Sequence, residues 1–261
     1  MDKMKQYVVD AFSDELFKGN QAAVCVTESW LPEELMMSIA RENNFSETAF
    51  SVKENDGYRL RWFTPGGEID FCGHATLGTS FVLFNFYEKD AKQITFYTRV
   101  GNLTVNREKD FYVMDFPAYN LNPVPVTEAM AEAIGIRPEA AFLDRDLLLV
   151  LQEEEQVKTL RPDQKRIEKL PGLLVAVTSP GKKYDCVSRM FAPKLGVGED
   201  PVTGSTHCMV TPYWCRRLQK NSLVCFQASE RTGILYTQME GERVKIAGKA
   251  TLFSVADIIP E

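Results

Sequence analysis

Two glycine-led segments of the chain combine ionisable and hydroxyl side chains in a pattern that could bind and activate a small acid. They read Asp70-Phe71-Cys72-Gly73-His74 and Asp200-Pro201-Val202-Thr203-Gly204-Ser205, and each precedes an apolar stretch expected to be helical, 75–86 and 206–217. The free N–H groups and the positive end of the dipole at a helix N-terminus attract carboxylates, and a glycine lets the ligand approach the backbone. Either glycine alone could serve only a tight turn. Their recurrence in matched contexts favours a carboxylate-binding role for both.

The two segments also predict an internal duplication. Aligning Gly73 with Gly204 sets an acid upstream of a glycine and a helix start in each half. A duplicated α+β unit would bring the two helix N-termini to face each other across a cleft. Within the second copy, Asp200 either caps its turn or hydrogen-bonds a substrate amine or hydroxyl. Ser205 likewise either begins the helix or donates to a ligand.

Glu47 is the candidate for moving a proton. It lies in Asn44-Phe45-Ser46-Glu47-Thr48-Ala49-Phe50, between the expected end of a helix and an apolar strand. A carboxylate that enters such a strand loses hydration, which raises its pKa and suits it to proton transfer near neutral pH. The alternative is a strand-edge glutamate that hydrogen-bonds only to its own turn.

The chain has two histidines, His74 and His207, and they lie in the two matched segments. Histidine titrates nearest neutrality, so either could donate or relay a proton. At a helix N-terminus, His74 is expected to favour its neutral form. We interpret His207, one turn into its helix, as a packed or capping residue.

Cys72 raises two further possibilities, a metal site and a thiol-based racemase. A tetrahedral set of Cys72, His74, His207 and Cys208 has unusual ligand spacing, and neighbours on a helix diverge by about 100°, so we expect no metal. In a two-base racemase matching thiols flank the substrate, but Cys72 aligns with Thr203, whose hydroxyl is too weak an acid. A Cys72-dependent racemase or epimerase and a non-catalytic small-acid binding protein remain as alternatives.

Composition and charge exclude several other classes. The 261 residues carry a net charge of −6, with 44% hydrophobic and 25% charged residues, as in ordinary soluble globular proteins. No long basic stretch predicts a nucleic-acid or membrane-surface partner, and the apolar runs are too short to span a membrane. The six cysteines include no CxxC pair, and the N-terminus lacks the apolar core of a signal peptide. We expect a cytoplasmic protein without a disulfide framework.

The order of the expected elements predicts an α+β fold in two halves. Alternating or short apolar segments typical of strands dominate both halves. Further helices are expected from Pro32 to Asn43, over 127–134 and over 161–169. Proline and asparagine over 117–125 place the boundary between halves 1–117 and 118–261, with the last strand, near 250–255, free to pack back on the first half.

Several motifs resemble those of the phenazine-biosynthesis (PhzF-like) isomerase family. They occur in the family's order and span most of the chain: Gly19-Asn20-Gln21-Ala22-Ala23-Val24, Asn44 to Phe50, Arg61-Trp62-Phe63-Thr64-Pro65, Cys72-Gly73-His74-Ala75-Thr76 and Glu199 to Ser205. The resemblance implies a diaminopimelate-epimerase-like fold. That fold has two pseudo-symmetric half-domains, each a curved, mostly antiparallel sheet around a central helix, usually in a homodimer.

The resemblance also implies roles for individual residues. In the family's phenazine enzyme a glutamate shifts a proton within a dihydro-hydroxyanthranilate ring, and that glutamate is similar to Glu47. The assisting histidine matches His74, and the aspartate and serine of the second half match Asp200 and Ser205. The substrate carboxylate would rest on backbone N–H groups around Gly73-His74 or Gly204-Ser205.

We assign Asn20, Cys72 and Thr203, which also lie in these motifs, to substrate binding. Gln21 stands where the family commonly has proline, and Cys72 and His207 resemble a broader branch more than the phenazine enzyme. The sequence therefore predicts a cofactor-independent isomerase of a small carboxylic acid, without naming that acid.

Overall fold

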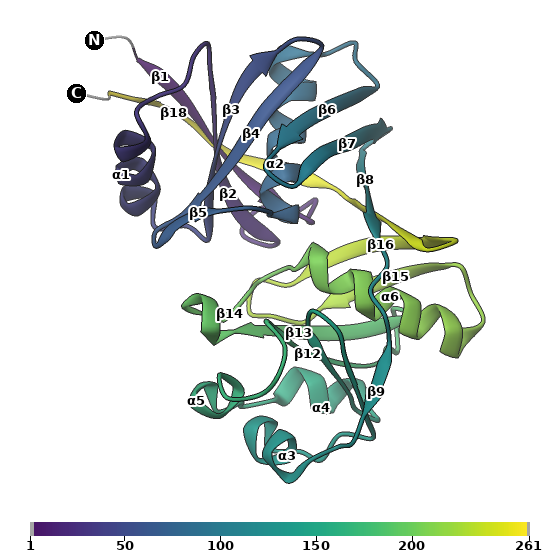
Figure 1. Cartoon of the computed structure of the whole chain (residues 1–261). Coiled ribbons are helices and arrows are strands. Elements are labelled where there is room, and N and C mark those ends of the chain that lie inside the picture. Colours follow the sequence, from purple (N-terminus) through teal and green to yellow (C-terminus); the bar gives the residue numbers. More distant parts are fainter. Residues whose placement is uncertain (1–2, 260–261) are drawn as a thin grey trace. The chain divides into compact units, whose positions relative to one another are not determined.

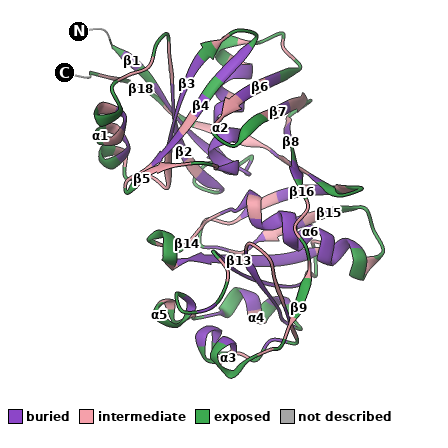
Figure 2. Cartoon of the chain, in the orientation of Figure 1, coloured by how far each residue is buried: buried purple, intermediate pink, exposed green. Residues whose placement is uncertain are grey.

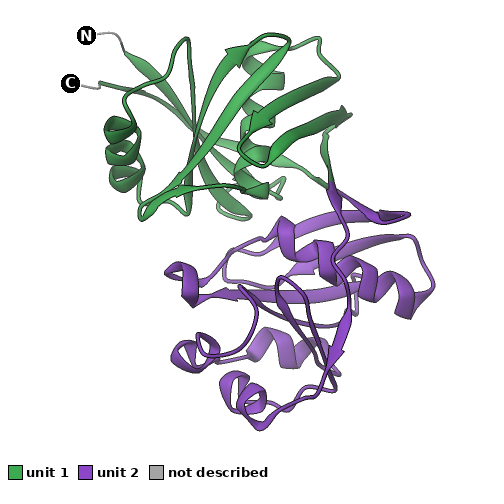
Figure 3. Cartoon of the chain, in the orientation of Figure 1, with its two compact units in different colours: residues 1–115, 247–261 green, residues 116–246 purple. Residues whose placement is uncertain are grey.

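The computed structural model describes residues 3–259, and these form two compact units (Figures 1 and 3). The first unit holds the chain up to Asp115 and again from Ala247 onward, and the second holds Phe116–Ile246. The chain crosses between them within strand β8 (Phe111–Pro117) and again within β17 (Arg243–Gly248). The last strand, β18 (Ala250–Ile258), therefore belongs to the first unit, where it pairs with β1 (Met4–Ala11).

The first unit is a mostly antiparallel sheet with two helices. Its remaining strands are β2 (Asn20–Thr27), β3 (Glu47–Glu54), β4 (Gly57–Thr64), β5 (Gly67–Ile69), β6 (Gln93–Thr98) and β7 (Gly101–Glu108). Its helices are α1 (Glu33–Asn43) and α2 (Gly73–Val82), and α2 continues into the π-helical turn η1 (Leu83–Tyr87). Strand β1 pairs antiparallel with β18 and β2, whereas β2–β3 and β4–β6 are parallel pairs.

The second unit repeats this topology. Its strands are β9 (Asn122–Val124), β10 (Ala140–Leu143), β11 (Leu147–Val150), β12 (Val175–Pro180), β13 (Cys186–Ala192), β14 (Val197–Glu199), β15 (Ser222–Gln227) and β16 (Gly233–Glu240). Its helices are α3 (Glu128–Ile134), α4 (Glu154–Thr159), α5 (Gln164–Ile167), the 3-10 turn η2 (Pro193–Leu195) and α6 (Gly204–Leu218).

The strand pairings match those of the first unit one by one. Strand β10 pairs antiparallel with β9 and β11, as β1 does with β18 and β2. The parallel pairs β11–β12 and β13–β15 correspond to β2–β3 and β4–β6. Helices α2 and α6 occupy the same place in this order and begin at Gly73 and Gly204. The predicted α+β fold of two similar half-domains is confirmed.

The central helices carry small, hydroxyl and apolar residues on all sides, which allows each helix to be buried around most of its circumference. Every residue of α2 from Gly73 to Ser80 is buried, and α6 is buried along most of its length (Figure 2). At Gly78, α2 lies close to the sheet, where a Cβ would make a van der Waals contact of 3.4 Å with the Cβ of Ala22 on β2. The sheet of the first unit thus packs directly on the helix that carries His74.

Two predicted helices differ from the structure. The charged helix expected over 161–169 is limited to α5, Gln164–Ile167. It begins after Asp163, whose side chain accepts from the Arg166 N–H as an N-cap. The helix expected over 75–86 widens into η1 after Val82, where the Glu88 N–H bonds to the Leu83 carbonyl at 2.7 Å. Within residues 3–259 no helix is long and apolar enough to cross a membrane.

Substituting Gly248 by alanine tests the packing of the first unit. A Cβ there would lie 2.4 Å from Phe12 Cδ1 and 2.9 Å from Leu77 Cδ1, and both side chains are fully buried. Such overpacking of a core costs about 1–3 kcal/mol of unfolding free energy, measured by urea denaturation. In the control Gly198→Ala, the new Cβ would approach only Gln164, at 3.9 Å, so its urea midpoint should stay unchanged. Equal midpoints for the two variants would contradict the packing described.

Candidate functional site

The site in the first unit forms where two parallel strands and a helix begin. Strands β2 and β3 are parallel neighbours, with Ala22 opposite Glu47, so both start at the same edge of the sheet. Asn20 is the first residue of β2, and Glu47 is the first residue of β3. Helix α2 begins at Gly73 beside this edge and contributes His74, with Cys72 as its N-cap residue.

His74 and three other residues predicted from the sequence lie together, with the three arranged around the His74 ring. Glu47 Oε2 lies 2.9 Å from His74 Nε2. The Asn20 Nδ2 atom lies 3.0 Å from His74 Nδ1, and Cys72 Sγ lies 3.5 Å from the same nitrogen. Asn20, Cys72 and His74 are buried, and Glu47 keeps 14% of its side chain exposed. Glu47 is therefore the member of the group with most access to solvent.

The Glu47–His74 contact is an ion pair rather than a directed hydrogen bond. The two atoms face each other at 2.9 Å, yet their orientation is outside that of a hydrogen bond, and in residues 3–259 neither has another such partner. Buried polar atoms are usually hydrogen-bonded, so an exception calls for a specific explanation, which a catalytic role would supply. Oε2 of the Glu47 carboxylate is such an atom.

The protonation of His74 follows from its neighbours. Burial alone would lower the pKa of His74, but its interactions with Cys72 and Glu47 outweigh this effect, and the pKa of His74 lies well above its usual value. Burial raises the pKa of Cys72 to about 11, so its thiol is neutral near pH 7 and Glu47 supplies the negative charge. The expectation of a neutral His74 is wrong, because the partial charge of a helix end is weaker than a carboxylate at 2.9 Å.

Asn20 fits both protonation states of His74. With Nδ2 toward the ring, the amide donates to an Nδ1 that carries no proton. A half-turn of the amide would exchange its oxygen for its nitrogen and place an acceptor beside a protonated Nδ1.

Glu47, Cys72 and His74 are also residue types that bind metal ions, and their ligand atoms lie within 4.8 Å of one another. However, Cys72 faces Nδ1 of the ring and Glu47 faces Nε2, whereas a histidine binds one ion through one nitrogen. The Cys72 thiol would also have to lose a proton held with a pKa of about 11. This donor set fits a zinc ion only after rearrangement.

The second unit holds another set of predicted residues at the start of α6. The hydroxyl of Thr203, the N-cap residue, donates to the Asp200 carboxylate. Gln227 joins both, since its Oε1 accepts from the Thr203 N–H at 2.8 Å and its Nε2 donates to the Asp200 carbonyl at 2.7 Å. Gly204 begins the helix, and Ser205 follows in its first turn. The structure thus fixes Asp200 and Thr203 against each other beside the N-terminus of α6.

Sequence reasoning missed Arg145, Asp146 and Gln227 at this second set. Arg145 Nη2 donates to Ser205 Oγ at 2.9 Å, and the Asp146 carboxylate accepts from Thr206 Oγ1 at 3.1 Å. An Arg-Asp pair directly before the apolar run 147–151 was the available signal, because charges that open a buried strand need partners. Gln227 gave no such signal, since it ends an ordinary strand.

His207 has a structural role, as interpreted from the sequence. Its Nδ1–H donates to the Thr203 carbonyl at 2.8 Å, and the side chain is 1% exposed. Burial lowers the pKa of His207 to about 4, so the ring is neutral near pH 7. The interpretation of His207 as a packed residue is confirmed.

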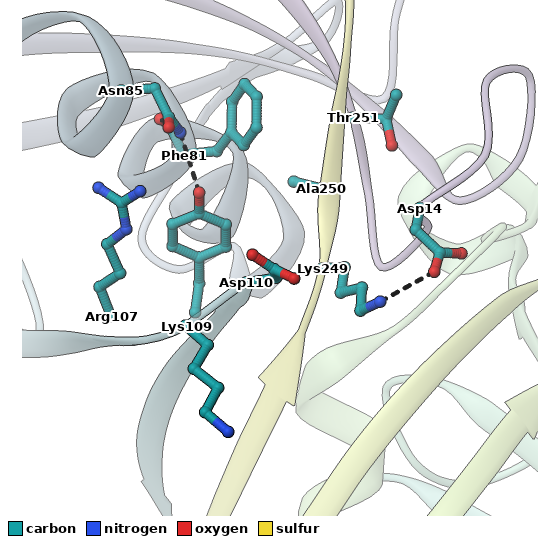
Figure 4. Close-up of a pocket in the computed structure, with 10 residues that line it drawn as sticks. Asp14, Phe81, Asn85, Arg107, Lys109, Asp110, Lys249, Ala250 and Thr251 are labelled. Carbon is teal, nitrogen blue, oxygen red and sulfur yellow. Dashed lines mark hydrogen bonds and ion pairs between the residues drawn. The ribbon is translucent and has the colours of Figure 1, made fainter.

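A cavity of about 290 Å³ lies toward the C-terminal end of α2, away from Gly73 (Figure 4). Its Asn85 amide donates to the Tyr112 hydroxyl at 2.9 Å, and Lys249 pairs with Asp14 at 3.0 Å. In Figure 4 the side chains of Arg107 and Lys109 extend away from Lys249. Its cationic groups do not converge, and we assign no ligand to this cavity.

Comparison with known proteins identifies the family. The model of the PhzC-PhzF family, described as phenazine biosynthesis-like protein, matches residues 9–256. The chain belongs to this family. It is 48% identical over 251 residues to an uncharacterized isomerase of Pseudomonas aeruginosa, covering 96% of each chain. A crystal structure of a PhzF-family protein from Enterococcus faecalis has a TM-score of 0.97 at 46% identity, covering 99% of this chain and 100% of that one.

More distant structures share the fold alone. A hydroxyproline epimerase from Agrobacterium vitis has a TM-score of 0.63 at 8% identity, covering 98% of this chain and 92% of that one. At this identity the likeness extends to the epimerase-like architecture and not to chemistry. It agrees with the predicted diaminopimelate-epimerase-like fold.

The two imidazole rings should titrate far apart in NMR spectra of the PhzF-like protein. We expect His74 to titrate well above pH 6.5, because Cys72 and Glu47 together favour its charged form more than burial opposes it. His207 should titrate near pH 4, because burial favours its neutral form. The variant His74→Asn assigns the signals by removing one set, and Glu47→Gln should lower the pKa of His74. A shared midpoint near 6.5 would refute the electrostatic account of this site.

Proposed function

We propose that the protein is a cofactor-independent isomerase that moves a proton between two carbons of a small carboxylic acid, with Glu47 as general acid and base. Family membership and relatives named isomerases support an isomerase. The observation that carries the finer proposal is the contact of Glu47 with His74, in which the Glu47 oxygen has no hydrogen-bond partner among residues 3–259.

The proposed reaction needs no oxidant or reductant. The Glu47 carboxylate takes a proton from a carbon alpha or vinylogous to the substrate carboxylate. The electron pair of the broken C–H bond enters the conjugated system and its charge spreads onto the carboxylate. Glu47 then returns the proton to another carbon, where a new C–H bond forms.

The neighbours of Glu47 have supporting roles in this proposal. Protonated His74 holds the Glu47 carboxylate in position, and Asn20 holds the ring. The N-terminus of α2 at Gly73 binds negative charge, since Cys72 makes no side-chain hydrogen bond that caps this helix. In the second unit, we assign charge stabilisation or substrate orientation to Asp200, and substrate binding to Thr203, Gly204 and Ser205.

Hydrogen exchange tests the role of Glu47. A panel of small carboxylic and amino acids is incubated with the protein in heavy water and read by NMR for deuterium at carbon. Glu47→Gln should lower the exchange rate of any active acid by about 10²- to 10⁴-fold, the usual contribution of a general acid–base group. Exchange at the natural rate in this variant would remove Glu47 from the mechanism.

Two controls accompany that measurement. Glu42→Gln changes an exposed glutamate of α1 and should leave the exchange rate unchanged. Exchange after dialysis against a chelator should also be unchanged, because the proposed chemistry uses no metal. A binding protein without activity would give ligand-induced thermal stabilisation and no deuterium in any acid.

The variant Cys72→Ala separates the proposal from a Cys72-dependent racemase. The thiol is 6% exposed and its pKa is about 11, so the nucleophilic and basic thiolate is rare near neutral pH. We expect the exchange rate to fall by less than about tenfold, through altered packing against His74. A loss as large as that of Glu47→Gln, in a variant with an unchanged circular dichroism spectrum, would favour the racemase.

A further inference from the structure

Three buried polar atoms in the second unit have no hydrogen-bond partner among residues 3–259. They are Nε2 of His207 and Oγ1 of Thr211, both on α6, and Oγ of Ser188 on β13. The three residues are at most 3% exposed. In proteins most buried polar atoms bond to the protein or to ordered water. Three such exceptions in one unit therefore call for an explanation.

Two of these atoms belong to the face of α6 that is turned to the sheet. This face contains four residues that follow one another at helical intervals, Thr203, His207, Thr211 and Trp214. At one end of the row the Gln227 side chain of β15 bonds to Thr203, with an N···O distance of 2.8 Å. At the other end Trp214 Nε1 donates to Thr178 Oγ1 of β12 at 2.9 Å. The two middle residues, His207 and Thr211, are thus held against the sheet from both sides.

Ser188 lies opposite the middle of this row. Strand β13 runs between β12 and β15, and Ser188 is paired with Thr178 on one and with Gln227 on the other. Paired residues point to the same face of a sheet, so Ser188 faces α6 as both of its neighbours do. Two residues along β13, Met190 Sδ accepts from Thr206 Oγ1 of α6 at 3.6 Å, which confirms this face. All three atoms are therefore directed into one interface, between β13 and α6.

The hydrogen-bonding capacity of these groups fits one small molecule with both donors and acceptors. Because Nδ1–H of the neutral His207 ring donates to the Thr203 carbonyl, Nε2 carries no hydrogen and can only accept. The Ser188 and Thr211 hydroxyls can each donate and accept. A water molecule can donate to Nε2 and still bond to both hydroxyls. A zinc ion, in contrast, would find one nitrogen where it needs four ligands.

We propose that Ser188, His207 and Thr211 bind one buried water between β13 and α6, and that this water donates to His207 Nε2. Three partners are typical of a buried water. The three atoms face one interface and do not bond one another, as in groups that a water bridges. The bond at Nε2 would keep the ring hydrogen on Nδ1, and so maintain the bond to the Thr203 carbonyl at the start of α6. The water site does not depend on the proposed proton transfer.

A crystal structure of the natural chain that resolves ordered water tests this site directly. We expect one water at about 2.7–3.2 Å from His207 Nε2 and from both hydroxyl oxygens. The double variant Ser188→Ala with Thr211→Val removes two of the three partners and should lose the water. No water beside Nε2, a direct bond from either hydroxyl to Nε2, or a water that survives the double substitution would each overturn the proposal. The natural chain decides the matter even where the double variant does not fold.

Urea unfolding of the full chain gives a second test, in solution. Ser188→Ala and Thr211→Val each remove one partner of the same water, so their effects on the unfolding equilibrium constant should not simply multiply. We expect the double variant to differ from the product of the single effects by more than about twofold, because the two residues share a partner. Agreement with that product within about twofold would contradict a shared water.

The variant Thr237→Val is the matched control for Thr211→Val. Thr237 is a buried threonine of β16 in the same unit and is paired with Leu223 of β15. Leu223 lies four residues from Gln227, the partner of Ser188, or about 13 Å along the strand. At that distance the effects of Ser188→Ala and Thr237→Val should multiply within about twofold. Equal coupling in this control pair would indicate a general loosening of the unit and would overturn the shared water as the cause.

Discussion

The ion pair between Glu47 and His74 is the interaction that the functional interpretation depends on. Two groups that are mostly withdrawn from water stabilise each other's charge, and loss of either one would leave an uncompensated charge in its place. Such a pair needs a rigid backbone frame that keeps the two side chains at a fixed separation. The frame is the parallel pairing of β2 with β3 and the start of α2, all of which meet at one edge of the sheet in the first unit.

The duplicated topology places different chemistry at equivalent positions. In the first unit the residue that opens β2, Asn20, contacts His74 in the first turn of α2. In the second unit the residues just before β11, Arg145 and Asp146, contact the first turn of α6 through its hydroxyls. Strand β3 begins with Glu47, but its counterpart β12 begins with an apolar residue, Val175. The two copies therefore carry different polar side chains at equivalent positions.

Local sequence signals located the elements that carry the site. The helix starts at Gly73 and Gly204 and the helix end at Asn44, which adopts a left-handed conformation at φ 50°, were all expected from residue type and spacing. The short strands β5, β9 and β14 were not expected, because three-residue segments carry no periodicity. The pairing of Arg145 with Ser205 joins residues 60 apart, and the charged state of His74 depends on a residue from another strand. No pattern within one segment encodes such contacts.

The proline inside α6 gives that helix an attachment point for the chain segment that enters the second unit. Pro212 has no N–H, so the carbonyl of Cys208 is left without its partner in the helix. The Tyr119 N–H takes that place at 2.8 Å, and the Tyr119 ring then lies against Arg145. Pro212 normally would interrupt a helix, but here it leaves the Cys208 carbonyl available to bind the chain segment that contains Tyr119. Residue 212 is thus linked to the Arg145 guanidinium through two contacts, the Tyr119–Cys208 hydrogen bond and the packing of the Tyr119 ring on Arg145.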